Sequence, residues 1–455
     1  MNTIKERAAA IAAAAQKLNS AVYNASNDHG KITEARTVAQ QHSPKLVSLE
    51  EAIKQSGLKD GMTISFHHHF RGGDKVVNLV VGKLAEMGFK NLHLAASSLL
   101  DTHEPLIEHI KNGVITQIST SGLRGELARQ ISLGLMENPV VFRSHGGRGA
   151  AIAKGELHID VAFLGASSSD PLGNACGYSR SENAQSICGS LGYALPDAEY
   201  ADKVVILTDD LVNYPNTPAS ISERYVDYVV QVDSVGDSSK IASGAIRDTK
   251  NPRDILLAKQ AAKVIEHSGY LTPGFSIQTG SGGASLAVVK YLRNAMVEQN
   301  IKASFALGGI TAHMVKLHEE GLIERLIDVQ SFDKVAAESL KNDAMHQEVS
   351  ACEYASPDEP GSAVHYLDIV ILSALEADVN FNVNVRFRRY YARSHWRPSR
   401  HGCRLGTFNH CLSAVARPHT VYCRRSYHPH HSGKQCRRYH HRIRYCRESA
   451  SPRIG

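Results

Sequence analysis

Residues 46–385 combine two hydrophobic patterns. Short runs rich in Val, Ile and Leu recur between Gly, Asp and Asn residues, and the stretches between them place apolar residues three or four positions apart. The runs predict strands at 62–66, 92–95, 114–118, 161–164, 204–207 and 228–232, and the stretches 76–87 and 123–135 predict helices. Strands that alternate with helices form a mostly parallel sheet covered by helices.

A second unit of the same kind follows a segment rich in Gly, Ser, Asp and Asn at 235–252, which predicts a domain junction. Beyond it we expect helices at 254–267, 284–297 and 311–320 and strands at 275–278, 304–307 and 367–372. The pattern stops near Val385. The predicted fold class is therefore α/β, with two tandem α/β domains at 46–246 and 247–385, of which the second is incomplete. Residues 1–45 read as a helical, polar N-terminal extension.

Composition divides the chain at the same point. Residues 386–455 hold 16 Arg, 1 Lys and one acidic residue, so their net charge is about +16, whereas residues 1–385 carry 34 basic and 44 acidic side chains. The formal net charge of +6 describes neither part. An acidic body argues against nucleic acid as a partner.

Cysteine usage and hydropathy bear on the compartment. The body has three scattered cysteines, at 176, 188 and 352, without a Cys-x-x-Cys pair, which favours a reducing compartment. No apolar run approaches the roughly 18 residues that a membrane span needs. The alanine-rich start is better explained by a surface helix than by a signal peptide. We therefore expect a cytoplasmic protein that does not contact a membrane.

Four glycine-rich turns are candidate binding elements because each follows a predicted strand and precedes a predicted helix. Such turns let a backbone approach a ligand and aim free N–H groups at anions. A tight structural turn explains any one of them, but four together predict a phosphate- or carboxylate-binding cleft between the domains. None matches a Walker A or dinucleotide-binding motif. The candidates are Gly72, Gly73, Gly146, Gly147, Gly280, Gly282, Gly283, Gly308 and Gly309.

Histidines and arginines accompany the first two turns. His67, His68 and His69 follow the strand at 62–66, and alternation places His67 and His69 on one side. They are either polar groups of the cleft or plain strand-end residues. No His/Glu spacing indicates a metal site, so we expect none. Arg71, His145 and Arg148 are the further candidates; each arginine either clamps a carboxylate or makes an ion pair. The residues alone assign no catalytic group.

A family resemblance rests on runs spread over residues 46–385. They include FRGGD at 70–74, SHGGR at 144–148 and QTGSGGASLA at 278–287, with further runs at 66–68, 120–125, 160–165, 188–193, 305–311, 328–333 and 381–385. In these runs the chain resembles the α subunit of citrate lyase. The loop at 179–187 departs from the pattern typical of that family.

The resemblance implies a CoA-transferase fold and an acyl-exchange activity. An α subunit of this family exchanges acetyl for citrate on a CoA-derived thiol of an acyl carrier γ subunit, through a mixed anhydride of the two acids. A β subunit then cleaves the citryl thioester. We therefore expect an oligomer with β and γ subunits, citrate and acetate as substrate and product, and no cofactor bound covalently to this chain. The alternatives are a CoA-transferase that uses free CoA and another short acid, and an inactive subunit.

The tail at 386–455 is interpreted as a product of translation in the wrong reading frame, and we expect it to be disordered. It adds 9 His and 5 Cys to its arginines without a zinc-ligand spacing. After a shift by one base, each new codon has its outer bases largely fixed by the present sequence. Residues 386–391 can then encode Gly-Ser-Asp-Gly-Ile-Met. Runs 396–403 and 429–439 can likewise encode sequences that resemble the family's continuation.

Overall fold

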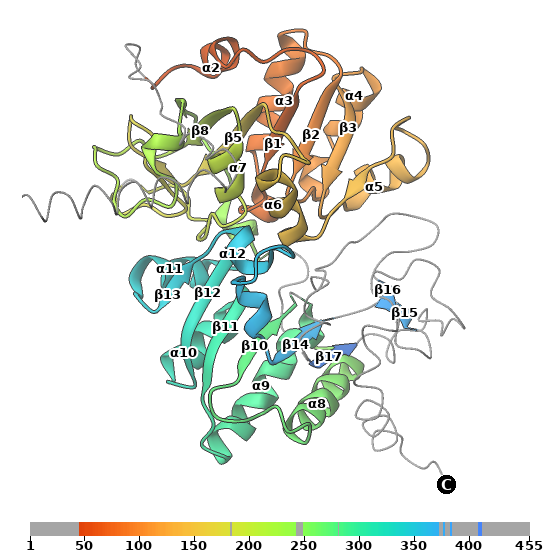
Figure 1. Cartoon of the computed structure of the whole chain (residues 1–455), viewed down its shortest axis with the longest axis vertical. Helices are drawn as coiled ribbons and strands as arrows, with labels where there is room; N and C mark the ends of the chain where they lie inside the picture. Colours follow the sequence, from red (N-terminus) through yellow and green to blue (C-terminus); the bar gives the residue numbers. More distant parts are fainter. Residues whose placement is uncertain are drawn as a thin grey trace, which may run out of the picture. The chain divides into compact units, whose positions relative to one another are not determined.

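The computed structural model describes residues 45–182, 184–242, 249–280 and 282–372, together with the short strands 376–377, 383–384 and 408–411. Two parallel sheets organise this part of the chain, each with its own helices (Figure 1). Among the described residues, no helix is long and apolar enough to cross a membrane.

The first sheet has seven strands in the order β4-β3-β2-β1-β5-β8-β9, and every neighbouring pair is parallel. Its strands are β1 (Thr63–Phe66), β2 (Leu92–Ala96), β3 (Ile115–Thr120), β4 (Val141–Phe142), β5 (Val161–Ala166), β8 (Lys203–Thr208) and β9 (Tyr228–Gln231). Its helices are α2 (Leu49–Gln55), α3 (Val76–Glu86), α4 (Leu106–Lys111), α5 (Gly125–Ser132), α6 (His145–Ala153) and α7 (Leu195–Tyr200). A small antiparallel pair, β6 (Ser168–Ser169) and β7 (Ala175–Cys176), follows β5.

The second sheet has six strands in the order β13-β12-β11-β10-β14-β17, again all parallel. Its strands are β10 (Ser276–Thr279), β11 (Ala303–Ile310), β12 (Ile323–Ser331), β13 (His346–Glu348), β14 (Ile369–Leu372) and β17 (Phe408–Cys411). Its helices are α8 (Pro252–Glu266), α9 (Gly283–Glu298), α10 (Ala312–Glu319), α11 (Lys334–Asn342) and α12 (Ala351–Ala355). The strands β15 (Glu376–Ala377) and β16 (Val383–Asn384) form a separate antiparallel pair.

Hydrophobic burial explains why these elements form. All six residues of β5 are buried, as expected for a central parallel strand that helices cover on both faces. Helix α8 begins where Asn251 caps the N–H of Arg253 and Pro252 occupies the first turn. The two-domain α/β class predicted from periodicity is confirmed.

Strand β11 differs from its prediction. The expected strand at 304–307 continues to Ile310, so Gly308 and Gly309 lie inside the strand and not in a turn after it. The register against β12 shifts between the two glycines, and Gly308 has φ +102°. Glycine accommodates such an irregularity in a strand, which is why the pair looked like a turn in the sequence.

The tail contributes one described strand. Residues 408–411 form β17, which pairs in parallel with β14 at the edge of the second sheet. The expected disorder of the tail as a whole stays a prediction. The rest of the tail, the N-terminal extension at 1–44 and the centre of the junction at 243–248 lie outside the described residues. The incompleteness of the second domain therefore stays a prediction.

Helices α6 and α12 bring the two sheets' helical layers into contact through a glycine. A Cβ atom added at Gly146 would lie 1.7 Å from the carbonyl oxygen of Ala355 and 2.2 Å from its carbonyl carbon. Both are backbone atoms, so they cannot rotate away as a side chain would. Only glycine permits this approach.

We predict that Gly146→Ala destabilises the protein by about 1–3 kcal/mol or more, the usual cost of forcing extra volume into packed structure. Urea unfolding of the full chain measures the change. Gly82, in α3, is the matched control because a Cβ there meets nothing within 4 Å. Gly82→Ala should stabilise by up to about 1 kcal/mol through helix propensity. Equal unfolding free energies for the two variants would contradict the contact.

Candidate functional site

The three histidines form a loop at the carboxyl end of β1. Their side chains are almost fully buried. The rings of His67 and His69 lie side by side at a tilt, with centroids 4.0 Å apart, as alternation predicts, whereas His68 Nδ1 lies 2.6 Å from Ser97 Oγ. The loop therefore places two imidazoles on one side and one on the other.

The ring of Tyr193 lies near imidazoles from both the histidine loop and helix α6. Its ring stacks on that of His68, with centroids 5.4 Å apart, and lies tilted against that of His145, the first residue of α6, at 4.7 Å. His69 lies 6.1 Å away. Tyr193 itself is only 2% exposed and precedes α7. The sequence analysis quoted the run 188–193 for its resemblance but did not identify this tyrosine as a site residue.

Arg71 is a buried cation in an unusual backbone conformation. It is 4% exposed and has φ +52°, in the left-handed region that costs most residues of the order of 1 kcal/mol. Its guanidinium carbon lies 4.6 Å from the centroid of the Phe332 ring. Among the described residues, no carboxylate pairs with it. Buried guanidinium groups normally have such a partner, which makes Arg71 the strongest anion-binding candidate.

Phe332 links Arg71 to the glycine pair of β11. A Cβ atom at Gly309 would lie 2.1 Å from Phe332 Cζ, so the ring packs directly on the glycine backbone. The Gly308–Gly309 pair therefore supports the surface on which Arg71 rests. It was expected to bind a ligand directly.

Hydrogen bonds from β12 hold the histidine loop against the second domain. Gln330 Nε2 donates to the carbonyl oxygen of His68 at 2.7 Å. Ser190, which lies three residues before Tyr193, donates from its Oγ to the carbonyl oxygen of Asp328 at 2.8 Å. These bonds bring candidate residues of both domains together, although Gln330 carried no sequence signal of its own.

Arg148 is placed differently from the other candidates. Its two terminal nitrogens each donate to a carboxylate oxygen of the buried Asp197 at 2.7 Å, and Nη2 also donates to the carbonyl oxygen of Ala95 at 3.1 Å. These bonds occupy the guanidinium nitrogens that a substrate carboxylate would need. The geometry favours the alternative of an ion pair, here between α6 and α7.

Three of the glycine-rich segments follow the carboxyl ends of strands, whereas Gly308 and Gly309 lie inside β11. Gly72 and Gly73 lie in the 3₁₀ turn Arg71–Gly73, and a Cβ at Gly73 would meet the carbonyl oxygen of Asp237 at 2.1 Å. Gly147 donates its N–H to Ser144 Oγ in the first turn of α6. Gly280 ends β10, Gly282 is the N-cap of α9 and Gly283 its first residue. A cleft lined by all four turns stays a prediction.

Burial and like charge hold the site's histidines neutral. Burial lowers the pKa of His69 to about 3, and burial followed by Arg124 lowers that of His145 to about 3. The pKa of His68 is well below its usual value for the same two kinds of reason, burial first and His145 next. Burial followed by Arg124 lowers the pKa of Arg71 to about 9, so it keeps its charge at neutral pH. The site therefore presents a cation beside neutral rings.

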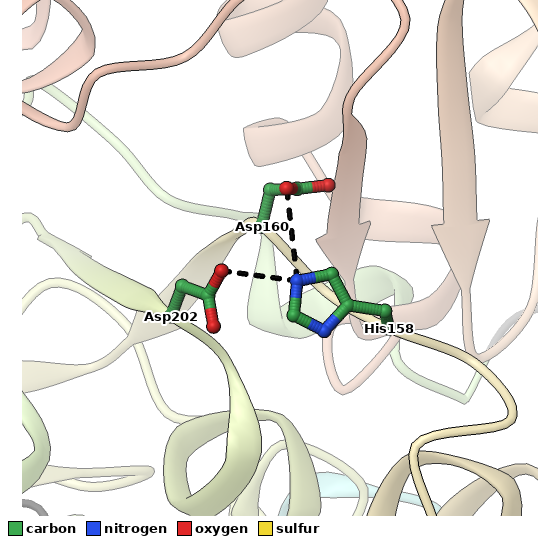
Figure 2. A group of neighbouring side chains, drawn as sticks. All are labelled: His158, Asp160 and Asp202. Atoms are coloured by element: carbon green, nitrogen blue, oxygen red, sulfur yellow. Dashed lines mark hydrogen bonds and ion pairs between the residues drawn. The ribbon is translucent and has the colours of Figure 1, made fainter.

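Within the described part of the chain, one group of side chains has spacing that suits a metal ion. His158 Nε2 lies 3.0 Å from Asp202 Oδ2 and 3.7 Å from Asp160 Oδ1 (Figure 2). The three residues lie at the amino ends of β5 and β8, the opposite edge of the sheet from Arg71. The other oxygen of Asp160 accepts the N–H of Thr63 at 2.7 Å. An exposed His–Asp ion-pair group accounts for this arrangement.

The fold also occurs in a distantly similar solved structure. A Pseudomonas malonate decarboxylase hetero-tetramer in complex with malonate contains a chain with the same architecture, at a TM-score of 0.60 and 16% identity. The similarity covers 80% of this chain and 68% of that one. At that identity the similarity shows the fold alone, which here is two α/β units that are each built on a parallel sheet.

The sequence comparisons are more specific. The family described as citrate lyase, alpha subunit (CitF), matches residues 43–387. The citrate lyase alpha chain of Haemophilus influenzae is 62% identical over 338 residues, which are 74% of this chain and 67% of that relative. The chain belongs to the citrate lyase α subunit family, which confirms the resemblance.

A solved structure supports the same assignment. The α subunit of citrate lyase from Streptococcus mutans in complex with citrate has 56% identity and a TM-score of 0.74. The similarity covers 77% of this chain and 69% of that one, so the matched region spans about two thirds of each relative.

The neutral His69 predicts acid sensitivity. Its pKa is about 3 in the folded protein and about 6.5 when unfolded, so the unfolded chain binds more protons between these values. The free energy of unfolding should therefore fall as the pH drops from 6.5 towards 3, by up to about 1.4 kcal/mol per pH unit for this histidine. His69→Gln should flatten that slope in urea unfolding measured at several pH values. A slope equal to that of the unchanged protein would contradict the assignment.

Proposed function

We propose that this chain exchanges acyl groups on the thiol of an acyl carrier subunit. Acetyl-carrier and citrate would give citryl-carrier and acetate. Membership of the citrate lyase α subunit family supports this proposal, as does the chemistry of the Arg71 site. The exchange needs a place where carboxylates lose water and meet a thioester.

The buried Arg71 is the observation that carries the proposal. A charged group without a counter-ion is costly to bury, and the left-handed backbone at Arg71 adds to that cost. A carboxylate of the acid would offset the cost, because its two oxygens match the planar guanidinium fork. Phe332 supports one face of the guanidinium and so orients that fork.

The exchange takes two steps that balance. In the first step, a citrate carboxylate oxygen attacks the acetyl thioester carbonyl carbon, and the C–S bond breaks to give a mixed anhydride and a thiolate. In the second step, the thiolate attacks the citryl carbonyl carbon, and acetate leaves. Each step passes through an oxyanion, which backbone N–H groups at glycine turns and helix N-termini can stabilise.

The neutral histidines suit this chemistry. Were His68 and His145 charged, they would hold a carboxylate too strongly as an ion pair and reduce its nucleophilicity. As neutral rings they offer hydrogen bonds without a net charge. The buried cation of Arg71 then positions the acid.

Partners and compartment follow from the same proposal. A γ subunit would bring the CoA-derived arm, whose phosphates suit the glycine turns, and a β subunit would cleave the citryl thioester. Nothing in the proposal requires a cofactor attached to this chain. The described cysteines, Cys176, Cys188 and Cys352, are free thiols, in keeping with a reducing cytoplasm.

The tail raises the alternative of an inactive subunit. We propose that residues 386–455 are out of frame, because their composition departs from the body and the family match ends at residue 387. The nucleotide sequence across the Val385 codon should encode the three family-like runs in a shifted frame. A genomic sequence without those runs would remove the proposal, and a restored chain would show whether the present tail costs activity.

We predict that Arg71→Lys raises the KM for citrate about 10- to 100-fold, because lysine keeps the charge but loses the bidentate fork. The measurement is exchange of labelled acetate from acetyl-carrier in the presence of citrate. Parallel assays with acetyl-CoA in place of the carrier distinguish the second candidate, a CoA-transferase that uses free CoA.

Arg129→Lys is the matched control. Arg129 lies on the exposed face of α5, where it pairs with Glu126, and the change there should leave the KM for citrate unaltered. An Arg71→Lys variant with unchanged kinetics would remove Arg71 from the binding site.

A further inference from the structure

Tyr193 brings a hydroxyl group into the centre of the site. Its ring lies against His68 and His145, which belong to the first domain. The same ring also belongs to a hydrophobic cluster that includes Val329 and Phe332 of the second domain. The guanidinium of Arg71 lies over the Phe332 ring. The side chains of Tyr193 and Arg71 therefore both lie beside this cluster.

The Tyr193 hydroxyl has no hydrogen-bond partner among the described residues, although the side chain is 2% exposed. Buried tyrosine hydroxyls normally find one. Tyr354, in the same cluster, follows that rule, because Gln278 Nε2 donates to its hydroxyl at 2.6 Å. The difference between the two tyrosines points to a ligand as the partner of Tyr193.

The surroundings select the kind of ligand. Burial raises the pKa of Tyr193 well above its usual value, so the hydroxyl stays a proton donor at neutral pH. Neutral imidazoles and the cation of Arg71 lie nearby, an arrangement that favours an anionic oxygen as the acceptor.

We propose that the Tyr193 hydroxyl donates a hydrogen bond to an oxygen of the acid's carboxylate that Arg71 binds. Tyr193 would then set affinity for the acid, while Arg71 neutralises its charge. This inference rests on the proposed function, because citrate is the acid that the exchange requires.

Access to the hydroxyl requires movement. Both the Tyr193 hydroxyl oxygen and Arg71 Nε are covered in the structure of the chain alone. The acid therefore reaches them only when neighbouring side chains shift, and its binding restores the partners that these polar atoms lack. Citrate should accordingly raise the melting temperature of the protein.

The test compares Tyr193→Phe with Tyr354→Phe in the full chain, by calorimetric titration with citrate and by thermal unfolding. Tyr193→Phe should weaken the Kd for citrate about 10- to 100-fold, the usual effect of losing a hydrogen bond to a charged group. Its melting temperature without citrate should not fall, because the lost hydroxyl has no protein partner.

Tyr354→Phe should do the opposite. It leaves the amide of Gln278 without its acceptor, so the melting temperature should fall by about 2–4 °C or more while the Kd for citrate is unchanged. A Tyr193→Phe variant that binds citrate normally, or that loses stability as Tyr354→Phe does, overturns the inference. A fall in kcat at unchanged Kd also overturns it, because the phenol would then act on the oxyanion.

The exchange assay separates this inference from the proposed function. If the unchanged chain binds citrate, loses affinity in Tyr193→Phe and yet exchanges no acyl group, the proposed function is wrong and the hydrogen bond stands. If it exchanges acyl groups and Tyr193→Phe binds citrate normally, only the inference is wrong. If the unchanged chain binds no citrate, both fall.

Discussion

Close backbone contact between the two α/β domains is the constraint on which the site depends. Gly146 meets the backbone of Ala355, and a Cβ at Gly192 would lie 2.2 Å from the carbonyl oxygen of Val349. Gly189 likewise leaves room for the side chain of Ser331. These glycines let β12 and α12 approach the histidine loop and Tyr193, so that neither domain alone contains the complete arrangement.

This contact also determines the electrostatics. By excluding water from the imidazoles, it keeps them neutral near pH 7, and by burying Arg71 it leaves a cation whose charge is poorly screened. An anion that enters such a place interacts more strongly than it would at the surface. The packing between the domains therefore also determines how strongly this region attracts an anion.

The sequence predicted the fold well because parallel sheets buried on both faces have long apolar strands and clear helical periods. It was less successful for β12, because the exposed Glu324 and Arg325 near the start of this strand interrupt its apolar pattern. Gly308 and Gly309 were mistaken for a turn because sequence shows the need for glycine without showing which neighbour imposes it. Here that neighbour is Phe332.

The candidate site was predicted in part. His68 and Arg71 were identifiable because they directly follow a strand, at the edge where parallel sheets bind ligands. Tyr193 and Gln330 were not, because their roles come from contacts between segments far apart in the chain. For Arg148 the sequence left a carboxylate clamp and an ion pair open, because its partner Asp197 lies 49 residues away in the chain.

The bond between Gln330 and His68 joins residues 262 positions apart. A ribosome adds roughly 5–20 residues per second, so the histidine loop is made about 13 to 50 s before the side chain that fixes it. During synthesis the nascent first domain must hold its loop with local bonds, such as that from His68 to Ser97. Because the first domain is synthesised before the second, the site can form only after this interval.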